Sequence, residues 1–176
     1  ACALLFATAA VPLFFNRGDT VSLWSLEAVL LYFFGLRGRL PHLRFAALSV
    51  YLSAAVCQLG GYGPAADTLL SGSWADTLFT AAGGGLLYAC WHKWRCEGSA
   101  AWERGFQTAS LAFAVLYASL LPMLLLSEDG KLSVAYSALA LLWAACQYRK
   151  RQPVFTAAAL LCGLTLIFFS INMSDG

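Results

Sequence analysis

An acidic side chain interrupts an otherwise apolar helical stretch near the start of the chain. Glu27 is the only charged residue in 20–36, a stretch long enough to cross a membrane. An ionised carboxylate inside a membrane helix costs about 2.5 kcal/mol or more, and such groups usually face the bundle interior or a water-filled cavity. With Trp24 one helical turn before it, Glu27 is our candidate intramembrane functional site. Two interpretations stay open: a proton, ion or ligand contact, or a hydrogen-bonded carboxyl that holds helices together.

Two further carboxylates, Asp67 and Asp76, lie in or beside the segment 60–73, which has the composition of a loop. They are candidates for outer-loop contacts with a ligand, whereas a plain connector would need no such role. The six cysteines show no C-x-x-C spacing, and the chain contains no H-E-x-x-H motif, phosphate loop or nucleophile–base pair. The sequence therefore predicts no catalytic residue, no cofactor and no metal site, and it favours a protein that is not an enzyme.

The composition indicates the class of protein to which these residues belong. Of the 176 residues, 60% are hydrophobic and 11% are charged, whereas a soluble domain is about a quarter charged. This composition excludes an ordinary soluble enzyme, a disordered chain and a secreted disulfide scaffold. A net charge of +2, with scattered basic residues, gives no reason to expect nucleic acid as a partner. We expect membrane lipids as partners, with further helices of a larger parent protein or a homo-oligomer packed alongside.

Apolar stretches of about 20 residues mark helices that cross the roughly 30 Å hydrocarbon core. No alternating barrel pattern appears, and lipid cannot satisfy the backbone of other structures. The expected fold is an all-α, polytopic transmembrane helical bundle, a single domain over 1–176 with about seven spans. The first span is too short and the chain opens on Ala1, so we interpret it as truncated. The spans are expected at approximately 2–15, 20–36, 43–59, 75–91, 106–126, 132–148 and 154–173.

The basic residues are distributed unevenly between alternate loops. Nine of the eleven Lys and Arg residues fall in the loops after the second, fourth and sixth expected spans. Basic residues in short loops stay on the cytoplasmic side during insertion. We therefore expect a bacterial inner-membrane protein with its N-terminus in the cytoplasm and its C-terminus outside. Recognition of lipid headgroups by these basic turns is an alternative explanation of the same clusters.

The basic turns also recur at a fixed spacing. Basic tripeptides begin at Arg37, Lys93 and Arg149, which are equally spaced, and Pro41 and Pro153 are separated by twice that interval. The pattern favours a bundle built from repeated helical hairpins, although two spans and two loops also reach this length by chance. Parallel repeats occur in transporters and in passive scaffolds, so the repeat does not choose between those functions.

Small residues gather in the expected fourth span. Ala81 and Gly85 form a small-x-x-x-small pattern that encloses Gly83 and Gly84. Such a pattern lets helix backbones approach closely. Close packing is the simpler explanation, and the alternative is a helix loosened for a binding site, as in transporters with broken helices.

A motif W-x-L-E…G-L-R runs from Trp24 and Glu27 to Gly35, Leu36 and Arg37, and a second apolar run follows it. This stretch resembles a large family of bacterial multi-pass membrane proteins, domain of unknown function 2339, whose members are usually longer. The rest of the chain is similar to the family only in hydropathy. The resemblance implies an inner-membrane location, makes Trp24 and Glu27 motif residues, and implies no established activity.

These observations lead to three hypotheses about function. The first is a structural or assembly module of a larger bacterial envelope protein, without enzymatic activity. The second is a transporter or channel component that uses Glu27 in an internal cavity. The third is a lipid- or glycan-handling membrane enzyme. A water-filled cavity at Glu27 would favour transport, whereas a dry carboxyl hydrogen-bonded to a neighbouring helix would favour the structural role.

Overall fold

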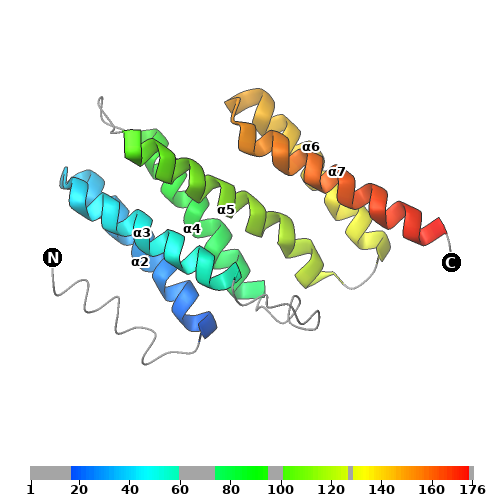
Figure 1. Cartoon of the computed structure of the whole chain (residues 1–176), viewed down its shortest axis with the longest axis horizontal. Helices are drawn as coiled ribbons and strands as arrows, with labels where there is room; N and C mark the ends of the chain where they lie inside the picture. Colours follow the sequence, from blue (N-terminus) through cyan, green and yellow to red (C-terminus); the bar gives the residue numbers. More distant parts are fainter. Residues whose placement is uncertain (1–16, 60–73, 95–100, 127–128, 175–176) are drawn as a thin grey trace. The chain divides into compact units, whose positions relative to one another are not determined.

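Helices make up nearly all of the part of the chain that the structure describes. The computed structural model describes residues 17–59, 74–94, 101–126 and 129–174. These residues form six helices and no strand, which confirms the all-α prediction for them (Figure 1). The helices are α2 (Arg17–Arg37), α3 (Pro41–Leu59), α4 (Trp74–Trp94), α5 (Ala101–Leu125), α6 (Asp129–Lys150) and α7 (Pro153–Ser174). The expected first span, 2–15, lies outside the described residues.

Within this part of the chain, three helices are long and apolar enough to cross a membrane: Thr20–Arg37 in α2, all of α3 and all of α5. This is fewer than the seven spans expected from the sequence. In α4, three glycines and two threonines dilute the apolar run, and His92 and Lys93 end it. Helix α6 carries charged residues at both ends, and α7 contributes a shorter apolar helix, Pro153–Ile167. The described structure is therefore helical, with three candidate membrane spans.

The helices form two compact units, Ala1–Ala114 (unit 1) and Val115–Gly176 (unit 2), and the division falls inside α5. In unit 1, α2 packs against both α3 and α4. Side chains spaced three and four residues apart lie on the same side of a helix. The buried face of α2 follows this spacing and consists of Val21, Ser25, Ala28 and Tyr32. Glu27 lies beside this face, half-buried.

Unit 2 combines the end of α5 with the hairpin of α6 and α7, which lie side by side (Figure 1). Leu132, Tyr136 and Cys162 form its buried core. The Tyr136 hydroxyl donates a hydrogen bond to the Ser119 carbonyl oxygen at 3.1 Å, and the Trp143 indole N–H donates to Ser119 Oγ at 3.2 Å. A single serine of α5 thus anchors α6.

The turns between α2 and α3 and between α6 and α7 share a rare backbone conformation. Arg39 has a φ of 54° and Arg151 a φ of 52°, in the left-handed region that favours glycine. Pro41 and Pro153 then begin the next helix in each hairpin, a position at which the missing proline N–H costs nothing. The two turns therefore share a left-handed residue two positions before the proline that begins the next helix.

Glycine at position 39 is expected to stabilise unit 1. The Arg39 N–H donates to the Leu36 carbonyl at 3.3 Å and the Leu40 N–H to the Gly35 carbonyl at 2.9 Å, the pattern of a Schellman motif, in which glycine is preferred. A left-handed non-glycine residue costs about 1 kcal/mol or more. We expect Arg39→Gly to raise the free energy of unfolding in detergent micelles by about 0.5–1 kcal/mol.

The matched control for this prediction is Arg37→Gly, which removes the same charge from the last helical residue of α2. Glycine within a helix costs about 1 kcal/mol relative to a good helix former, so this variant should be less stable than the parent chain. If both variants lost stability equally, the side chain of Arg39 would matter more than the backbone conformation of the turn.

Candidate functional site

A fully buried carboxylate joins three helices of unit 1. Glu103 stands in the first turn of α5 and has no solvent exposure. The Tyr32 hydroxyl, on α2, donates a hydrogen bond to Glu103 Oε1 at 2.7 Å. From α3, Arg44 Nη1 lies 2.9 Å from Oε2 and 3.0 Å from Oε1 of the same carboxylate. We call Tyr32, Arg44 and Glu103 the carboxylate cluster.

Gly35 on α2 makes room for the arginine of this cluster. A Cβ atom at position 35 would lie 2.8 Å from Arg44 Cγ and 3.0 Å from the Arg44 backbone nitrogen. Without that atom, the aliphatic stem of Arg44 rests on the backbone of α2 while its guanidinium reaches Glu103. The Arg44 side chain keeps 19% of its exposure, whereas the Glu103 side chain keeps 1%, so the ion pair connects the interior of unit 1 with its surface.

Aromatic rings join the same two helices as the ion pair. Phe45 of α3 lies 5.5 Å, centroid to centroid, from Trp102 and from Phe106 of α5. Phe45 follows Arg44 and Trp102 precedes Glu103 in the sequence, so these rings join the same two helices. The aromatic contacts therefore add a second link between α3 and α5.

The polar face of α5 continues beyond Glu103. Gln107 and Ser110 follow it at spacings of four and three residues, and both are fully buried. Within the described residues, Ser110 Oγ and Ser25 Oγ have no hydrogen-bond partner. A buried polar group without a partner is costly, by about 1–3 kcal/mol, and atoms of this kind commonly bind water in protein interiors.

A second polar contact joins α3 to α4. The Gln58 side-chain amide donates to Thr77 Oγ1 at 3.1 Å and accepts a hydrogen bond from the Thr80 hydroxyl. The Tyr51 hydroxyl donates to the Thr80 carbonyl oxygen at 2.9 Å. All four residues are buried. Unit 1 therefore contains two sets of polar contacts between helices: the carboxylate cluster and this group on α3 and α4.

Gly83 and Gly84 let α4 approach its neighbours closely. A Cβ atom at Gly84 would overlap the Tyr51 hydroxyl and would lie 2.6 Å from the Ser110 carbonyl oxygen of α5. One at Gly83 would lie 3.3 Å from Ser25 Cβ of α2, whereas one at Gly85 would meet nothing within 4 Å. The close packing expected for this segment therefore occurs at Gly83 and Gly84, and Gly85 faces open space.

The residues singled out from the sequence are not members of the carboxylate cluster. Glu27 and Trp24 are half-buried on α2, each with interactions of its own. Asp76 lies in the first turn of α4 and accepts a hydrogen bond from the Ser22 hydroxyl at 2.6 Å, which joins α4 to α2. Asp67 lies outside the described residues. The hydrogen-bond partners of Glu103 in the cluster are instead Tyr32 and Arg44.

The sequence does not predict the carboxylate cluster, because the expected fifth span, 106–126, begins after Glu103. In the structure α5 begins at Ala101, five residues before the expected start of that span. One signal in the sequence pointed to a helix: Glu103, Gln107 and Ser110 are spaced as residues on one helical face. Arg44, its ion-pair partner, is 59 positions away, and no local pattern connects the two residues.

The geometry of the site suits a fixed ion pair that holds helices in place. Among the described residues, no group of three His, Cys, Asp or Glu side chains lies close enough together to hold a metal ion.

No family model, curated protein sequence or solved structure matches this chain. The class of protein that the described residues define is therefore an all-helical protein with three apolar helices long enough to span a membrane.

Proposed function

We propose that this chain is a multi-pass protein of a bacterial inner membrane that acts as a structural or assembly module of a larger envelope protein. The observation that carries this proposal is the position of Glu103. Its carboxylate is buried and receives hydrogen bonds from both Tyr32 and Arg44. A charge bound in this way fixes the arrangement of three helices, as a static module requires.

The outward faces of the helices support the membrane location. On α2, Leu26, Leu30 and Phe34 follow one another at intervals of four residues, and each is at least half exposed. Helices α6 and α7 also expose large apolar side chains: Val134, Leu141, Leu142, Leu160, Leu161, Leu164 and Ile167. Contiguous apolar surface of this kind suits contact with lipid or with helices of a partner.

The repeated turn geometry supports the hairpin architecture of the proposal. Arg39 and Arg151, both with positive φ, are separated by twice the interval between the basic tripeptides in the sequence. We propose seven spans built from such hairpins, with the basic turns and the N-terminus in the cytoplasm and the C-terminus outside. Membership of the family of domain of unknown function 2339 belongs to the same proposal.

One observation favours a second candidate, a transport component. Ser110 and Ser25 hold hydroxyl groups without partners in the interior of unit 1, on two of the helices that form the carboxylate cluster. Polar groups inside a membrane bundle commonly mark ion pathways and proton relays. In this alternative Glu103, rather than Glu27, is the acidic residue that we expect transport to require.

Proton flux into liposomes distinguishes the two candidates. The purified chain is reconstituted in vesicles loaded with a pH-sensitive dye, and a pH step is applied. If the chain is a structural module, vesicles that contain the parent chain or Glu103→Gln should leak protons no faster than vesicles without protein. A faster rate that Glu103→Gln abolishes and Glu27→Gln preserves would overturn the structural proposal and support transport.

The assembly role has its own measurement. Extraction of bacterial membranes in a mild detergent, followed by native gel electrophoresis, should show the chain in a complex well above the mass of one 18.9 kDa chain in its micelle. Alkaline carbonate washes should leave the chain in the membrane pellet. Migration as a single chain under all extraction conditions would contradict an assembly function.

A further inference from the structure

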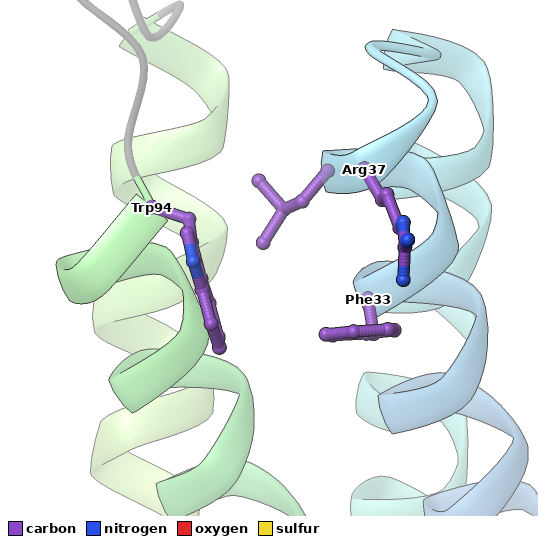
Figure 2. A pocket seen from close by; sticks show the side chains of 4 residues that line it. Phe33, Arg37 and Trp94 are labelled. Carbon is purple, nitrogen blue, oxygen red and sulfur yellow. The ribbon is translucent and has the colours of Figure 1, made fainter.

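A cavity between α2 and α4 lies at the ends of both helices. It has a volume of about 390 Å³ and is lined by Phe33, Leu36 and Arg37 of α2 and by Trp94 of α4. Figure 2 shows Trp94 extending from α4 on one side and Phe33 and Arg37 from α2 on the other. The Phe33 and Trp94 rings meet edge to face, with centroids 5.9 Å apart and planes at 79°. We call this cavity the aromatic–arginine pocket.

The pocket is positively charged at its rim and apolar inside. Arg37 is the last residue of α2 and is exposed. A second cation, Lys93, places its Nζ atom 4.8 Å from the centroid of the Trp94 ring. No acidic side chain is among the lining residues that the structure describes, and Arg37 forms no ion pair with any of the described residues. A ligand with a negative group at one end and an apolar body complements these features.

We propose that the aromatic–arginine pocket binds an anionic phospholipid. The planar guanidinium of Arg37 suits a phosphate oxygen pair, and Lys93 adds a second positive charge. The upper part of an acyl chain then lies against Phe33, Leu36 and Trp94. The cavity has the size of a small-molecule site, about 300–1,000 Å³. This inference rests on the proposed membrane function, because it requires the helix ends with Arg37 and Lys93 to lie at the level of the lipid headgroups.

Titration of the full chain with phosphatidylglycerol tests the charged end of the pocket. The chain is held in a neutral detergent, and native mass spectrometry measures the fraction with bound dioleoylphosphatidylglycerol. Loss of a charge-assisted hydrogen bond to the phosphate costs about tenfold or more in affinity, so Arg37→Gln should weaken binding by at least about tenfold. The matched control Arg39→Gln removes an equal charge two residues away, outside the pocket lining, and should change binding less than twofold.

A second pair of variants tests the apolar end. Phe33→Ala removes one wall of the pocket, and we expect it to weaken binding about tenfold, as the loss of a well-covered aromatic side chain does. Phe34→Ala, at a side chain that is 58% exposed and does not line the pocket, should leave binding unchanged. Circular dichroism of all four variants checks that their helix content is preserved.

Three outcomes would overturn the proposal. Equal losses in Arg37→Gln and Arg39→Gln would indicate diffuse attraction of anionic lipid instead of a site. Equal binding of dioleoylphosphatidylcholine would show that the headgroup charge is not recognised, and competition by soluble glycerol phosphate would identify a site for free phosphate. Carbonate extraction tests the membrane location separately. If the chain stays in the membrane but does not bind phosphatidylglycerol, only the lipid site is refuted.

Discussion

Replacement of Gly84 by alanine is expected to lower the free energy of unfolding of this chain by about 3 kcal/mol, near the upper end of the usual cost of overpacking. The new Cβ atom would lie 2.6 Å from the Ser110 carbonyl oxygen and would overlap the Tyr51 hydroxyl. The tyrosine can move only by giving up its hydrogen bond to the Thr80 carbonyl. Because the Ser110 carbonyl oxygen belongs to the backbone of α5, α4 and α5 must separate, which weakens packing along both helices.

Gly85→Ala is the matched control, since it adds the same methyl group one residue further along α4. A Cβ atom there meets nothing within 4 Å, and alanine favours a helix by about 1 kcal/mol over glycine. Unfolding of the two variants in mixed detergent micelles, followed by tryptophan fluorescence, should give changes of opposite sign. A Gly84→Ala variant as stable as the parent chain would contradict the close approach of α4 to α5.

The glycine segment shows what spacing can and cannot predict. Its small residues correctly predicted close packing of this helix. The expected pattern paired Ala81 with Gly85, but the tight contacts are made by Gly83 and Gly84. Consecutive positions on a helix point about 100° apart, and three adjacent glycines offer equally small surfaces in three directions. Only the positions of Tyr51 and Ser110, on other helices, determine which of these directions is occupied.

Helix positions were the most predictable feature of the chain. Each expected span from the second onward coincides with a helix, as for 43–59 and α3 (Pro41–Leu59). A run of apolar residues is a local property, so its position can be read directly from the sequence. Where a helix begins is determined by other interactions. α5 starts at Ala101, before its apolar run, and the polar first turn includes Glu103, whose carboxylate is bound by α2 and α3.

The choice of Glu27 as the key carboxylate followed from hydropathy, which detects a charge inside an apolar stretch. Burial follows a different property, the face of the helix on which a residue lies. Glu27 is half-buried, while Ala28, its neighbour on the inner face of α2, is fully buried. Glu103 is the reverse case, since it lies near a helix end but faces the interior. For both carboxylates, the burial of the side chain depends on the helix face on which it lies and not on its position along the helix.

Removal of the Glu103 carboxylate is expected to destabilise the chain by about 3–4 kcal/mol in Glu103→Ala. The loss leaves the Arg44 guanidinium without its counter-charge in a position that is only 19% exposed. It also leaves the buried Tyr32 hydroxyl without its acceptor at 2.7 Å, and each unpartnered buried group adds to the cost. Glu103→Gln keeps an acceptor oxygen for both donors, and we expect it to lose about half as much.

A double-mutant cycle shows whether this loss comes from the ion pair or from helix α5 itself. Arg44→Met alone also leaves a buried charge, but Arg44→Met with Glu103→Ala leaves none. The double variant should therefore be more stable than the sum of the single losses predicts, by about 2 kcal/mol. Glu27→Ala is the control carboxylate and should cost about 1 kcal/mol or less. Equal losses in Glu27→Ala and Glu103→Ala, or strict additivity in the cycle, would show that the carboxylate cluster does not hold the helices of unit 1 together.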